Sequence, residues 1–66
     1  MEAYVQRMVE EQAQLKERII KLNTFLKSNK FNELDDYQKS LLIRQREGMC
    51  VYFETLTARL ELNKDD

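Results

Sequence analysis

Residues that interrupt helices are almost absent from this sequence, which has no proline and a single glycine, Gly48. Apolar residues recur at alternating spacings of three and four through the first half, with one polar position at Gln12. This heptad spacing predicts a helix over residues 2–27. A second stripe predicts a helix over residues 36–62. Its members are Leu41, Leu42, Gln45, Met49, Tyr52, Phe53, Leu56 and Leu60.

The connector, residues 28–35, carries turn chemistry. Ser28 and Asn29 favour a turn, and Asn29 can adopt the left-handed conformation that ends many helices. Phe31 and Leu34 are three residues apart, so a single helical turn would let both close the end of a hairpin.

The second helix is expected to begin at Asp36, because Asp35 and Gln38 have the spacing of a capping box. A connector this short makes the two helices antiparallel neighbours. The sequence therefore predicts an all-α fold, one helical-hairpin domain over residues 1–66.

A chain of 66 residues rarely buries enough apolar surface alone. One cysteine, Cys50, cannot form an intramolecular disulfide, and without histidine no structural metal site is expected. Cys50 is interpreted as a small packing residue. Apolar residues off the seams favour a homo-oligomeric helix bundle. They are Tyr4, Val9, Ile20, Phe25, Ile43, Val51 and Phe53.

Gly48 costs about 1 kcal/mol relative to alanine within a helix. Three interpretations stay open: close packing of a neighbouring helix, close approach of a ligand, or tolerance without a role.

The charge balance argues against several functions. Eleven basic and twelve acidic residues leave no basic excess for generic nucleic-acid binding. No apolar run has the length of a membrane span or of a signal-peptide core, so we expect a cytosolic protein. Without histidine or a glycine-rich phosphate loop, neither catalysis nor a cofactor is expected.

Tyrosines and arginines form the first candidate binding cluster. Counting outwards from the connector places Tyr4 and Arg7 beside Thr55 and Arg59 at the open end, with Tyr52 further in. Tyrosine rings can stack on a base, and arginines can fork onto phosphate oxygens. In the alternative interpretation the tyrosines pack in an interface and the arginines pair with carboxylates, namely Glu11, Glu54 or Glu61.

A second candidate cluster lies near the middle of the hairpin, where Arg18, Arg44 and Gln45 are expected near Gln12. A glutamine on an apolar stripe needs a hydrogen-bond partner when buried. Both glutamines can therefore set the register of the helices, or they can read a ligand.

The order of motifs resembles a family of short accessory proteins encoded by tailed phages and prophages. The matching pieces are Tyr-x-Gln-Arg-x-Val-x-Glu, Lys-Leu-x-x-Phe, Phe-x-x-Leu, Gln-x-x-x-Met-x-x-Tyr and Leu-x-x-Arg. They fall on Tyr4, Gln6, Arg7, Val9, Glu11; Lys21, Leu22, Phe25; Phe31, Leu34; Gln45, Met49, Tyr52; Leu56 and Arg59. The resemblance implies a phage origin and leaves the activity open.

Small phage proteins of this kind include anti-defence factors that sequester nucleotide signals of host immunity in pockets between protomers. By analogy, the first hypothesis is an anti-defence protein that binds a cyclic ADP-ribose isomer or a cyclic oligonucleotide in the host cytoplasm. The second is a protein-binding or regulatory helical module without a small-molecule ligand.

Overall fold

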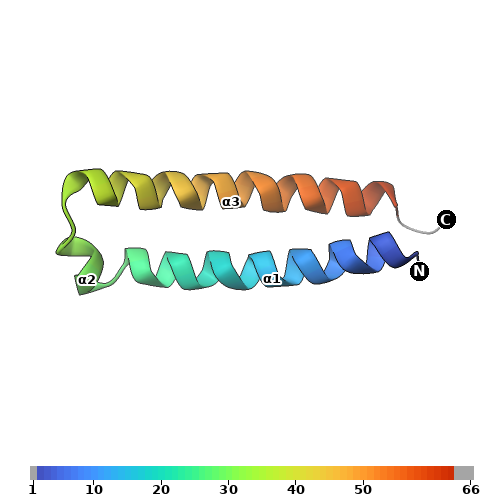
Figure 1. Cartoon of the computed structure of the whole chain (residues 1–66), viewed down its shortest axis with the longest axis horizontal. Coiled ribbons are helices and arrows are strands. Elements are labelled where there is room, and N and C mark those ends of the chain that lie inside the picture. The colour runs from blue at the N-terminus through green and yellow to red at the C-terminus, as the bar shows by residue number, and fades with distance from the viewer. Residues whose placement is uncertain (1, 64–66) are drawn as a thin grey trace.

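The computed structural model describes residues 2–63. It contains α1 (Ala3–Leu26), the short α2 (Asn29–Asn32) and α3 (Asp36–Leu62). Figure 1 shows α1 and α3 side by side and antiparallel, with α2 in the bend. The predicted all-α helical hairpin is confirmed. The molecule measures 49 × 15 × 14 Å, so its interior is only the seam between two helices.

The stripe predicted on α1 faces α3. Val5, Met8 and Leu15 are buried, and Gln12 between them is half-buried. Gln12 Nε2 donates a hydrogen bond of 2.7 Å to Oγ1 of Thr57 on α3. This bond satisfies the polar position in the seam, as the register-setting interpretation requires.

The stripe predicted on α3 is partly wrong. Leu56 is fully buried, but Gln45 is exposed and Arg46 is half-buried in its place. Arg46 follows Leu42 by four residues and precedes Met49 by three, so it continues the seam. Its aliphatic stem can pack there while the guanidinium reaches water.

At the bend, Ser28 serves both adjoining helices. Its Oγ donates to the carbonyl of Phe25 (2.6 Å) and accepts from the backbone N–H of Phe31 (3.3 Å). Asn29 does not adopt the expected left-handed conformation, because no residue in the described part of the chain has a positive φ. Ser28 is extended instead and caps α2.

Phe31 closes the hairpin end, as its spacing predicts. The rings of Phe25 and Phe31 meet edge to face with centroids 6.3 Å apart. Lys39 Nζ lies 5.8 Å from the centroid of the Phe31 ring. The first turn of α3 is thereby held against α2.

The beginning of α3 follows its cap. Asp35 accepts a hydrogen bond of 2.8 Å from the backbone N–H of Gln38. This contact satisfies one of the free amides of the first turn, and the acidic Asp36 suits the positive end of the helix.

The register expected between the helices is wrong by about one and a half to two helical turns, or roughly 8–10 Å, as the Tyr4–Asn63 and Gln12–Thr57 bonds show. Tyr4 was expected near Thr55 and Arg59, whereas its hydroxyl donates to Oδ1 of Asn63 at 2.7 Å. The reason lies at the bend, where α3 begins over α2 rather than over the end of α1 (Figure 1).

Gly48 does not mark a close contact between the two helices. A Cβ atom built on it meets nothing within 4 Å. The interpretation that α1 packs closely against Gly48 is therefore wrong. Three interpretations remain: close approach of a second copy, close approach of a ligand, or tolerance without a role.

Candidate functional site

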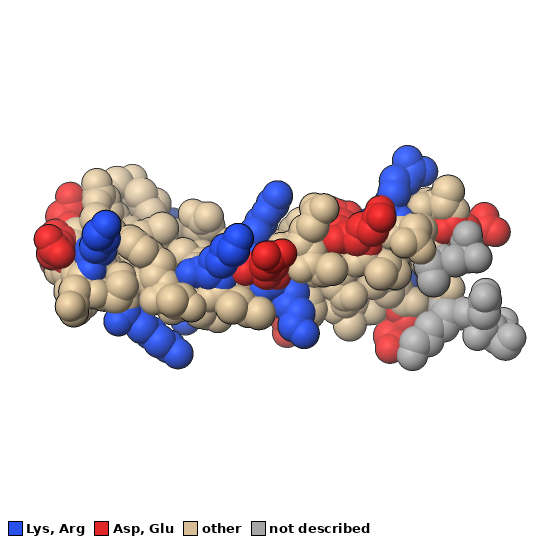
Figure 2. Space-filling view, turned by 90° about the horizontal axis from the view of Figure 1, so that it is seen from below, with Lys and Arg blue, Asp and Glu red and all other residues tan. Residues whose placement is uncertain are grey.

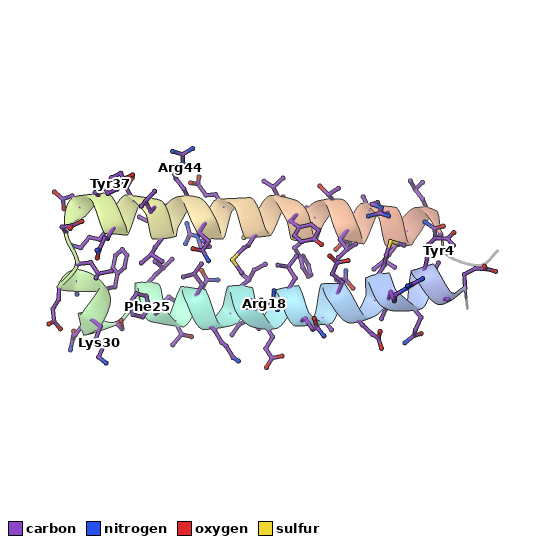
Figure 3. All side chains as sticks on the ribbon, viewed as in Figure 1. Tyr4, Arg18, Phe25, Lys30, Tyr37 and Arg44 are labelled. Carbon is purple, nitrogen blue, oxygen red and sulfur yellow. The ribbon has the colours of Figure 1, made fainter. Side chains whose placement is uncertain are left out.

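The open end of the hairpin is tied together by Asn63, which ends α3. It accepts from the hydroxyl of Tyr4, and its Nδ2 donates to the carbonyl of Arg59 at 2.7 Å. Figure 3 shows Tyr4 at this end, between the two long helices. The bond shows which side of α1 lies beside which side of α3.

Two guanidinium groups share that side. Arg7 lies one turn from Tyr4 along α1, and Arg59 lies one turn from Asn63 along α3. Because Tyr4 is bonded to Asn63 and Gln12 to Thr57, Arg7 and Arg59 lie within one helical turn of the same level, one on each helix of this face. Tyr4, Arg7 and Arg59 therefore share the open end, although Tyr4 meets Asn63 and not the expected level of Thr55.

Both arginines are exposed, and neither has a hydrogen bond or ion pair from its guanidinium within residues 2–63. Within residues 2–63 no ion pair joins these arginines to Glu11 or Glu54, and the alternative interpretation stays open for contacts between copies. Elsewhere on α1, Lys21 and Glu17 form an ion pair at 3.8 Å.

Tyr52 extends the face towards the bend. It precedes Arg59 by seven residues, or two turns, and so lies on the same side of α3, about 10 Å further in. Tyr4 is 49% exposed and Tyr52 is 44% exposed, so a ligand can reach both residues. We call Tyr4, Arg7, Tyr52 and Arg59 the tyrosine–arginine face.

The second candidate cluster is divided by the structure. Gln45 precedes Tyr52 by seven residues and Arg18 follows Arg7 by eleven, so each shares a side with the tyrosine–arginine face. Figure 3 shows that Arg44 instead points away from α1. Arg44 is therefore not brought together with the other candidates.

Sequence reasoning missed two residues. Asn63 joins the end of α3 to the start of α1, and the only signal for it was its spacing of four from Arg59. Arg46 lies in the seam where an apolar residue was expected, and its spacing from Leu42 and Met49 could have revealed it.

The wider surface carries mixed charge. Figure 2 looks onto α1 and shows acidic and basic side chains interspersed, without a continuous basic stripe on that face. Among residues 2–63 there is no acidic, cysteine or histidine cluster that could hold a metal ion. No helix in that range is long and apolar enough to cross a membrane.

Free guanidinium groups beside exposed tyrosine rings are side chains with which proteins bind anionic aromatic ligands. The sequence model of the Sequestin family matches residues 2–62, and the chain belongs to the Sequestin family. This is a phage anti-defence family whose members are non-enzymatic and sequester nucleotide immune signals. No curated protein and no solved structure gave a match.

The family assignment confirms the resemblance to phage proteins and the anti-defence hypothesis. It favours signal sequestration over the regulatory helical module.

Proposed function

We propose that this chain sequesters its nucleotide signal, a cyclic ADP-ribose isomer or a cyclic oligonucleotide, on the tyrosine–arginine face. The ligand is enclosed by a neighbouring protomer of a homo-oligomer, in the cytoplasm of the infected bacterial cell. One observation carries the proposal: Arg7 and Arg59 lie close to the same height along the hairpin, beside Tyr4, and neither guanidinium has a partner within residues 2–63.

The chemistry of the face fits a phosphorylated nucleotide. A guanidinium fork donates two parallel hydrogen bonds to phosphate oxygens, and its charge persists at every physiological pH. Arg7 and Arg59 can approach a phosphate from its two sides, because one comes from each helix. Tyr4 and Tyr52 offer rings on which a base can stack, and Gln45 offers an amide for its polar edge.

Assembly is part of the proposal for two reasons. A hairpin is one layer of two helices, so it covers a ligand from one side only, whereas small-molecule sites bury most of the ligand. The hairpin also has little interior of its own. Its buried residues, within the part described, are Val5, Met8, Leu15 and Leu56.

The proposal is tested by calorimetric titration with cyclic ADP-ribose isomers and cyclic dinucleotides. Arg7→Ala and Arg59→Ala each remove a charge-assisted hydrogen bond worth about 1.5–3 kcal/mol, which is roughly a 10- to 150-fold loss of affinity. The matched control is Lys21→Ala, which removes a cation of the same sign whose only resolved partner is Glu17. It should leave the affinity unchanged.

The stacking role of Tyr4 has its own control. Tyr4→Ala should cost about 1–3 kcal/mol of binding free energy through lost stacking. Tyr4→Phe keeps the ring and loses only the hydrogen bond to Asn63, so it should retain most of the affinity. Size-exclusion chromatography follows each variant. Failure of the wild type to bind any of these nucleotides refutes the proposal, and variants that dissociate into monomers assign the face to assembly.

A further inference from the structure

The side of the hairpin away from the tyrosine–arginine face carries its own pattern. The two hydrogen bonds between the helix flanks lie on opposite sides of the seam. Asn63, bonded to Tyr4, and Thr57, bonded to Gln12, are six residues and therefore about 120° apart around α3. The Gln12–Thr57 bond thus marks a second face.

On this second face, five residues of α3 form a stripe at spacings of three, four, four and three: Ile43, Arg46, Cys50, Glu54 and Thr57. The spacings read the same in both directions from Cys50. Ile43 is 40% exposed, whereas Arg46, Cys50 and Thr57 are half-buried. We call these five residues the α3 stripe.

Charge along the α3 stripe is opposite on the two sides of its centre. Arg46 lies one turn before Cys50 and Glu54 one turn after it, and neither has an ion pair anywhere in residues 2–63. Two such stripes laid antiparallel, with Cys50 on a two-fold axis, bring each arginine against the glutamate of the other copy. Parallel stripes would place like charges together, which is unfavourable.

Apolar residues of α1 border the stripe. Along the hairpin, Val9 and Ile20 lie on either side of the height at which Cys50 stands on α3. They are 37% and 55% exposed. Val9 lies seven residues before Lys16, and Ile43 lies seven before Cys50. Counted from the Tyr4–Asn63 and Gln12–Thr57 bonds, Lys16 and Cys50 lie within one helical turn of the same level. Because α1 and α3 are antiparallel, the two-fold axis brings Val9 of one copy to the level of Ile43 of the other.

In this arrangement Lys16 of one copy lies near Lys16 of the other, and it is the one cation for which this happens. The side chain is exposed at the border of the stripe, and its long stem lets the ammonium group turn into solvent. We propose that the α3 stripe is a docking surface for a second copy of this chain. The two copies pack antiparallel about a two-fold axis at Cys50 and exchange Arg46–Glu54 ion pairs.

This dimer leaves both tyrosine–arginine faces outward, so ligand binding and dimer formation use different sides of the hairpin. Closing the proposed ligand pocket then falls to a protomer of another dimer. The two proposals can fail separately, because the docking surface is tested without any nucleotide.

The test is sedimentation velocity on charge-reversal variants. Arg46→Glu and Glu54→Arg each create two like-charge contacts, and each should weaken the dimer about ten- to a hundredfold. The double variant restores opposite charges and should recover most of the wild-type affinity. Arg44→Glu is the matched control, with the same charge change two residues away on a side chain that points away from α1 (Figure 3), and it should leave the dimer intact.

A second measurement uses the wild-type chain. A short bis-maleimide should link Cys50 to its copy and give a covalent dimer, which Cys50→Ser abolishes. A monomeric wild type, a double variant no tighter than the single ones, or no Cys50 cross-link in a dimer that forms would overturn the antiparallel stripe.

Discussion

Gly48→Ala should stabilise the protein, because a Cβ atom at this position meets nothing within 4 Å. Gly48 lies within α3, where alanine is favoured over glycine by about 1 kcal/mol. The gain comes from the unfolded chain, which loses conformational freedom, and not from a new contact. A stabilisation of this size raises the melting temperature of a small domain by about 4–8 °C.

The assay is thermal unfolding followed by far-ultraviolet circular dichroism at one fixed protein concentration, because assembly makes the melting temperature concentration-dependent. The matched control is Ala13→Gly, an exposed position inside α1, which should lower the stability by a similar amount. A lower melting temperature or a smaller assembly for Gly48→Ala would contradict the reasoning. Either result would mean that a second copy lies against this glycine.

Leu56→Ala should lose about 2–5 kcal/mol, since Leu56 is fully buried, whereas Leu62→Ala at an 86% exposed position should cost almost nothing in the same melting experiment. Asp35→Ala removes the cap of α3 and should cost about 1 kcal/mol in urea titrations; an unchanged midpoint would show that the cap is dispensable. Gln12→Ala breaks the bond to Thr57 and should lower the free energy of unfolding by about 0.5–1.5 kcal/mol. The same loss in a chain that already carries Thr57→Val would contradict an interaction between the two side chains.

The helices and their ends could be predicted from the sequence because their causes are local. Heptad spacing determines the buried side of α1, and Asp35 and Ser28 cap the helices with their own side chains. The turn around Phe31 likewise follows from residues close to it in sequence.

The register could not be predicted, since a heptad stripe repeats every two turns and accepts several alignments. The length that α2 occupies in the bend decides among them, and it shifts α3 until Tyr4 meets Asn63. The same shift brings Arg7 within one helical turn of the level of Arg59. Gln45 and Arg46 exchanged places for a related reason: neighbouring residues differ by about 100° around a helix, and packing decides which one faces the seam.

The central claim is that the chain binds a nucleotide signal and does not consume it. Purified protein is incubated with cyclic ADP-ribose isomers and cyclic dinucleotides, the filtrate is removed, and the retained protein is heat-denatured for mass spectrometry of the released nucleotide. We predict that one of these nucleotides is depleted from the filtrate and released with its mass unchanged, and that Arg7→Ala with Arg59→Ala abolishes the depletion. Nucleotides that all remain in the filtrate, or a released product of altered mass, would contradict the account.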